Sequence, residues 1–224
     1  MTTVPVTAES RSFLEELRMQ RWDDHRYYHQ SRINQALHLL SACCFLATYA
    51  LMFSHPAIAA FLGWIVAMWV RQIGHFFFEP RGFDHVNNAS FEHKEEIKLG
   101  YNLRRKVILL SIWIAIPVIL WFEPTGFGLV DGWQTTSEYL DTVGAAWLWL
   151  GFGGVAARSL WLCATHSVQT GLVWGTKIIT DPINDIQFYW KSPLKLLQGE
   201  LIDPMTHVAT HETAPDESRE APAA

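Results

Sequence analysis

Apolar residues gather in four long runs along the chain, and polar segments separate the runs. Three of them approach or exceed the roughly 20 residues that an α-helix needs to cross the hydrocarbon core of a bilayer. The third run is the shortest, and we expect its ends to lie at the membrane interface. The pattern therefore predicts four transmembrane helices, at about residues 36–53, 57–78, 107–122 and 143–165.

The four predicted helices come in two pairs. Only residues 54–56, Ser-His-Pro, separate the first two, which favours a tight helical hairpin. We therefore expect an all-α, polytopic membrane fold built from two hairpins. Residues 1–205 are predicted to form a single helical domain, and the Ala-, Glu- and Pro-rich residues 206–224 are predicted to form a disordered tail.

The basic residues fall on one side of this arrangement. Residues 1–35 contain five Arg and the loop 79–106 contains six Lys or Arg, whereas residues 54–56 and 123–142 contain neither. Cytoplasmic loops carry the excess of Lys and Arg, so both termini and the middle loop are predicted to be cytoplasmic. The charged first segment lacks the apolar core of a cleavable signal peptide. We expect a multi-pass protein of a bacterial inner membrane or an endoplasmic reticulum.

The segments outside the spans also predict helices. Residues 10–32 contain no Pro or Gly and predict a cytoplasmic amphipathic helix that runs into the first span. A helix is expected to continue over 166–177, and the sequence Asp-Pro-Ile-Asn-Asp at 181–185 predicts a turn. Residues 186–201 mix aromatic, apolar and basic residues, which is typical of a segment on the membrane surface, and Pro193 is expected to break or bend it.

Composition narrows the function. Half of the 224 residues are hydrophobic and 17% are charged, which excludes a disordered chain. The three cysteines form no CxxC pair of the kind that binds metals or carries out redox chemistry. The net charge of −5 does not indicate a nucleic-acid-binding protein, which is usually basic. The expected partner is the lipid bilayer. The sequence leaves open whether the chain also forms a homo-oligomer or binds other membrane proteins.

Histidines supply the candidate chemistry. Six of the ten lie near the cytoplasmic ends of the first two predicted spans or in the loop that follows: His25, His29, His38, His75, His85 and His93. Neutral imidazole is the commonest metal ligand, and several imidazoles with a carboxylate are the donors of a non-haem iron site. For His38 alone, a hydrogen-bonded packing role is an equal alternative.

Spacing sharpens this hypothesis. His75 and Glu79 are four residues apart and share a helix face, and Gly74 beside them allows a neighbouring helix to approach. His29 and His38 are nine residues apart, which places them on opposite sides of an ideal helix. They can reach one metal only if the helix breaks, or if His29 folds over from before the helix start.

Two motifs resemble a known family. Residues 27–38 have the pattern Y-x-H-x4-N-x3-H, and residues 72–79 have the pattern Q-x-G-H-x3-E. Together they resemble the membrane 2-hydroxy fatty acid dioxygenases, over about residues 25–80 of this chain. Members of that family are small integral membrane proteins, and the yeast member is an iron(II)-dependent enzyme of fatty-acid α-oxidation that shortens 2-hydroxy fatty acids by one carbon.

The resemblance implies an iron(II) site, with O₂ and a fatty-acid-like molecule as substrates. It makes His29, His38 and His75 metal-ligand candidates, and it gives Asn34 and Glu79 a role as ligands or as residues that orient a ligand.

The chain departs from the family after Glu79, where it continues Pro-Arg-Gly-Phe-Asp-His to residue 85. His85 is a candidate local addition to the metal site. Arg71 inside the second span or Arg81 could hold a substrate carboxylate, although Arg71 could also extend to the interface. Arg158 in the fourth span could pair with Glu79 or hold a carboxylate.

Two other functions stay open. A histidine-box lipid hydroxylase would hold two irons with HxxxH and HxxHH clusters, but this chain has no HxxHH. A non-enzymatic scaffold or assembly subunit would use the tryptophan-rich fourth span and residues 186–201 for docking. Its histidines would then bind no catalytic metal, or would bind a pigment or haem.

Overall fold

The computed structural model describes residues 11–100 and 102–205. The described chain is helical without named strands, which confirms the predicted all-α class. The predicted tail at 206–224 lies outside the described residues. In chain order the elements are α1 (Phe13–Tyr28), α2 (Arg32–Leu51), α3 (Pro56–Phe61), η1 (Leu62–Met68), α4 (Trp69–Ile73), η2 (Gly74–Phe78), α5 (Phe91–Ile97), α6 (Leu103–Phe122), α7 (Thr136–Thr165), α8 (Val168–Tyr189) and α9 (Ser192–Leu197).

Four helices are long and apolar enough to cross a membrane, as the hydrophobic runs predict. They are α2, the continuous 23-residue helix from α3 to η2, α6 and α7. The last two begin earlier than the apolar runs, because polar side chains cap their first turns. Asn102 accepts a hydrogen bond from the Arg105 amide, and Thr135 forms a capping box with Glu138.

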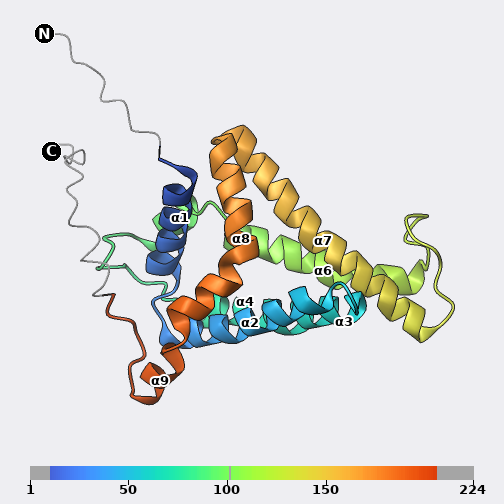
Figure 1. The fold of residues 1–224 in the computed structure, drawn as a ribbon, viewed down its shortest axis with the longest axis horizontal. Coiled ribbons are helices and arrows are strands. Elements are labelled where there is room, and N and C mark those ends of the chain that lie inside the picture. Colours follow the sequence, from blue (N-terminus) through green and yellow to red (C-terminus); the bar gives the residue numbers. More distant parts are fainter. Residues whose placement is uncertain (1–10, 101, 206–224) are drawn as a thin grey trace, which may run out of the picture.

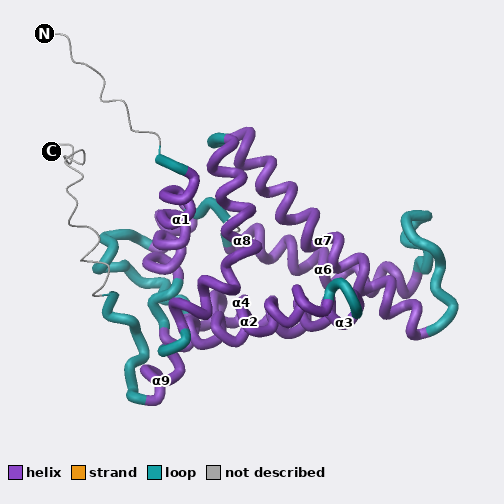
Figure 2. Tube along the Cα trace, in the orientation of Figure 1, coloured by secondary structure: helices purple, strands orange, loops and turns teal. Residues whose placement is uncertain are grey.

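The helices pack as two hairpins joined by α8. The segment α3–η2 returns along α2, and α6 and α7 form the second pair (Figure 1). Helix α8 packs against α1, α2 and α7, and therefore links the two hairpins to the N-terminal helix. Loops lie mainly at the ends of the assembly (Figure 2).

The expected continuous helix from residue 10 into the first span is wrong. Helix α1 ends at Tyr28 and α2 begins at Arg32, with residues 29–31 as a link. The backbone of this link pairs with the C-terminal segment: Arg32 N donates to Leu201 O at 2.9 Å, and Asp203 N donates to Gln30 O at 2.7 Å. Partners about 170 residues away therefore stabilise the break, which local sequence cannot reveal.

The turn expected at 181–185 is also wrong, because α8 continues through Pro182. Proline removes one helical hydrogen bond, but tertiary contacts outweigh that loss here. Lys177 Nζ contacts Asp181 Oδ2 at 2.8 Å, and Asp185 Oδ2 contacts Arg71 Nη1 at 3.0 Å. The helix ends at Tyr189. Pro193 then lies in the first turn of α9, where its missing N–H costs little, so the predicted interruption agrees with the structure.

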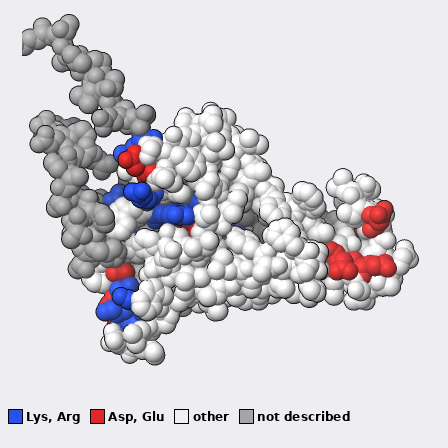
Figure 3. All heavy atoms as spheres, viewed as in Figure 1, with Lys and Arg blue, Asp and Glu red and all other residues white. Residues whose placement is uncertain are grey.

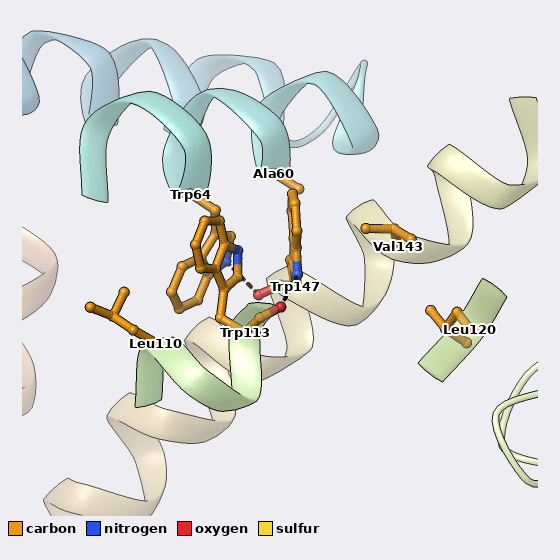
Figure 4. Packing of buried hydrophobic residues seen from close by; sticks show 7 residues of the cluster. All are labelled: Ala60, Trp64, Leu110, Trp113, Leu120, Val143 and Trp147. Carbon is orange, nitrogen blue, oxygen red and sulfur yellow. Dashed lines mark hydrogen bonds between the residues drawn. The ribbon is translucent and has the colours of Figure 1, made fainter. Parts of the chain in front are cut away.

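A tryptophan cluster joins the two hairpins inside the apolar region. Trp64 of η1, Trp113 of α6 and Trp147 of α7 lie with their ring centroids 5.2–5.7 Å apart along the cluster (Figure 4). Trp64 Nε1 donates to Trp147 O at 2.8 Å, and Trp147 Nε1 donates to Trp113 O at 3.0 Å. These bonds satisfy indole N–H groups that find no acceptor in hydrocarbon.

Helices α7 and α8 approach closely at Gly171. A Cβ at this position would collide with Cys163 Sγ and with the Ser159 carbonyl. We expect Gly171→Ala to lower the free energy of unfolding by about 1–3 kcal/mol, since overpacking forces the helices apart. Thermal unfolding of the detergent-solubilised protein measures this. Gly153→Ala is the matched control, because a Cβ there meets nothing within 4 Å, and equal melting temperatures for the two variants would contradict the prediction.

Candidate functional site

Three histidines from separate segments meet at the end of the first hairpin. His29 lies in the link after α1, His38 lies on α2 and His75 lies on η2. One ligand atom from each lies within 4.8 Å of the others, and the Nε2 atoms of His29 and His38 are 3.3 Å apart. The break at 29–31 satisfies the condition that the nine-residue spacing imposes, because it places His29 before the start of α2. We call these three residues the histidine triad.

Hydrogen-bond acceptors lie behind two rings of the triad, and a carboxylate lies farther from the third. His29 Nδ1 is 2.8 Å from the carbonyl oxygen of Asp24, and His75 Nδ1 is 2.7 Å from Glu79 Oε2. His38 Nδ1 lies 3.6 Å from Asp185 Oδ2. Acceptors at Nδ1 of His29 and His75 favour the tautomer that carries its proton there, so the Nε2 atoms of these two rings keep a lone pair for a metal.

The donor set fits a metal ion. Two Nε2 lone pairs that face each other at 3.3 Å repel unless a cation or a proton lies between them. His29 and His38 are almost completely buried, and burial lowers the pKa of His29 well below its ordinary value. Neutral imidazoles with outer hydrogen-bond partners are what divalent transition metals bind.

Asn34 lies on α2, four residues before His38. It is fully buried on α2, and its Nδ2 donates to the carbonyl of Tyr28 at 2.9 Å, which holds the end of α1. A Cβ at position 74 would collide with Asn34 Oδ1, so Gly74 is required for the close approach of η2 to α2. The close approach that the sequence predicted at Gly74 is therefore present.

Glu79 follows η2 in an extended conformation and orients His75. Its Oε1 atom is buried without a hydrogen-bond partner among the described residues. Burial raises the pKa of Glu79, and the positive charges of Lys98 and Lys106 oppose that rise. The carboxyl group therefore lies between the triad and a group of basic side chains.

The structure does not bring His85 to the triad. His85 is exposed in the loop after η2, with its ring 5.0 Å from that of Phe83. Arg81 is also exposed, and its Nη2 donates to the carbonyl of Phe76 at 3.0 Å. His85 therefore has no part in the metal site that we propose below.

The two intramembrane arginines have protein partners. Arg71 forms the ion pair with Asp185, so its charge is already balanced. Arg158 donates to the carbonyl oxygen of Leu99, with its Nε at 3.0 Å.

Sequence reasoning missed the contribution of α8. Asp185 lies behind His38, and the Tyr189 ring lies 5.7 Å from the His29 ring. The hydroxyl of Tyr189 is 3.1 Å from Nδ1 of His25, which ties α8 to α1. Two aspartates four residues apart, at 181 and 185, were the available signal, but Pro182 between them indicated a turn instead.

Comparison with protein families finds one match at this site. Residues 18–92 match the family model described as 2-hydroxy-palmitic acid dioxygenase Mpo1-like. The match spans about a third of the 224-residue chain and supports the resemblance that the two histidine motifs indicate. The Mpo1-like region contains the whole triad with Asn34 and Glu79, and it ends before α6, so Asp185 lies outside it. Comparisons with curated proteins and with solved structures find no match.

Proposed function

We propose that this chain is a membrane-embedded, iron(II)-dependent dioxygenase that shortens 2-hydroxy fatty acids by one carbon. The observation that carries the proposal is the triad itself: two buried imidazoles and one partly buried imidazole each bring a ligand atom within 4.8 Å of the others, and His29 and His75 have acceptors at Nδ1. The Mpo1-like match over the same residues supports the substrate class.

His29, His38 and His75 would hold the metal. When bound there, iron(II) would supply the coordination of oxygen ligands and the activation of O₂. The surrounding residues supply orientation: the Asp24 carbonyl and Glu79 keep the protons of His29 and His75 on Nδ1. Burial of the triad excludes bulk water from the reacting groups.

The distribution of charge supports a cytoplasmic site. Lys and Arg gather at the end of the molecule that carries α1 and α9, and acidic side chains mark the opposite end (Figure 3). The connection between α6 and α7 contains no Lys or Arg. By the positive-inside rule, the triad and both termini lie on the cytoplasmic side of a bacterial inner membrane or an endoplasmic reticulum.

The test is conversion of 2-hydroxypalmitate by the full chain. Protein purified anaerobically in detergent and loaded with iron(II) is expected to bind iron near stoichiometrically. On addition of O₂ it should yield the fatty acid that is one carbon shorter, as measured by mass spectrometry. Omission of O₂ or addition of an iron chelator should stop the reaction.

Loaded protein that leaves 2-hydroxypalmitate unchanged in the presence of O₂ would refute the proposed activity. An absorption band of bound haem or pigment in the purified protein would also count against it, because a mononuclear iron(II) site with histidine ligands is nearly colourless.

A further inference from the structure

A small pocket adjoins the triad where the second and third spans end. Its lining includes His75 and Glu79 together with the basic side chains of Lys98 and Lys106. Glu79 directly follows the second span, and Lys106 lies in the first turn of α6. The pocket therefore lies at the level where lipid head groups meet the hydrocarbon core.

Three cations line this pocket, and one of them has no partner among the described residues. Arg81 donates to a carbonyl, that of Phe76, and Lys98 Nζ lies 3.5 Å from the ring centroid of Tyr28. For the Nζ atom of Lys106, the described part of the chain provides neither a hydrogen bond nor an ion pair within 4 Å.

The two carboxylates of the pocket are already engaged. Glu95 accepts the Leu103 amide at 2.7 Å and contacts Lys98 Nζ at 3.5 Å. Glu79 accepts from His75 through Oε2, and only its buried Oε1 has no partner in the described residues. The pocket thus carries more positive than negative charge and also offers one free acceptor, which suits an anion that bears a hydroxyl group.

We propose that this pocket binds the carboxylate head group of the fatty acid, and that Lys106 is the cation that pairs with it. The inference rests on the proposed function, because it takes an acidic amphiphile as the ligand. The alkyl chain would then enter the lipid beside exposed apolar side chains of the same helices, such as Phe77 of η2 and Val107 of α6.

This assignment differs from the candidates that the sequence offered. Arg71 already has Asp185 as its counterion at 3.0 Å, so it has little charge to offer a second carboxylate. Arg81 is exposed, and its Nη2 already donates to the carbonyl oxygen of Phe76. Lys106 lies beyond residue 92, where the Mpo1-like match ends, so no family motif points to it.

The test compares a charged with a neutral head group. The full chain is placed in zwitterionic lipid nanodiscs and depleted of metal, and binding of radiolabelled 2-hydroxypalmitate and of its methyl ester is measured against empty nanodiscs. Lys106→Gln is expected to weaken binding of the acid about tenfold or more, because a charge-assisted hydrogen bond is lost. Binding of the ester should not change.

Two further variants control for folding and for charge in general. Lys106→Arg should restore binding of the acid to within about threefold of the wild type, since it keeps the positive charge. Arg104→Gln removes one charge from an exposed position of the same helix and should leave binding of the acid unchanged. Equal losses for acid and ester, or equal effects of Arg104→Gln and Lys106→Gln, would overturn the assignment.

Because binding is measured without metal, its outcome is separate from that of the dioxygenase assay. Binding of the acid that depends on Lys106, together with absence of turnover by iron-loaded protein, would support the pocket and refute the proposed function. Turnover that is unaffected by Lys106→Gln, with unchanged binding of the acid, would refute the pocket and leave the proposed function in place.

Discussion

Replacing His38 with alanine is expected to lower the affinity of the protein for iron(II) by more than about 100-fold, since loss of even an outer partner of a ligand costs about 10–100-fold. His38 lies on α2, with its ring centroid 4.2 Å from that of His29 and 4.9 Å from that of His75. Its removal leaves two nitrogen donors from different segments. The measurement is iron competition against a chelator of known affinity.

His55→Ala is the matched control for this variant. His55 is exposed in the turn of the first hairpin, where its Nδ1 contacts Ser54 Oγ at 2.9 Å. Its replacement removes an imidazole but should leave iron affinity unchanged. If His38→Ala keeps wild-type iron affinity while it remains folded, the triad is not the metal site.

The membrane spans and the contact between His75 and Glu79 could be predicted, because each depends on a pattern within one short stretch of sequence. Four apolar runs of near-membrane length were enough to predict the four spans, because a helix satisfies its own backbone hydrogen bonds in hydrocarbon. The pairing of His75 with Glu79 follows from a spacing of four residues on one helix face, and the structure gives that contact at 2.7 Å.

The parts that could not be predicted depend on distant partners. The link at 29–31 carries no helix breaker, and backbone bonds to residues 201–203 hold it open. Helix α8 passes through Pro182 because buried charges compensate: Lys177 Nζ lies 3.1 Å from Asp24 Oδ2 and 2.8 Å from Asp181 Oδ2. Burial alone would raise the pKa of Asp24, but Lys177 keeps it well below its ordinary value. This ion-pair network holds α8 against α1.

The packing of α8 against α2 places Asp185 Oδ2 3.6 Å from His38 Nδ1. The variant Asp185→Asn tests whether this carboxylate influences metal binding by His38. We expect iron affinity to fall about 10–100-fold, because the carboxylate behind His38 favours the tautomer with Nε2 free and increases its basicity. Asparagine keeps the volume of the side chain and one acceptor oxygen but loses the charge. Asp141→Asn, on the exposed first part of α7, is the matched control and should not affect iron affinity.

Asp185 also pairs with Arg71, so a loss of affinity could reflect an uncompensated buried arginine instead. A double-mutant cycle separates the two effects. Arg71→Met removes the ion pair, and Asp185→Asn in that background changes only the group behind His38. A persistent loss of iron affinity in this background would mean that Asp185 acts through His38. Disappearance of the loss would mean that its role is to neutralise Arg71, and α8 would then support the fold of the site without tuning its metal ligands.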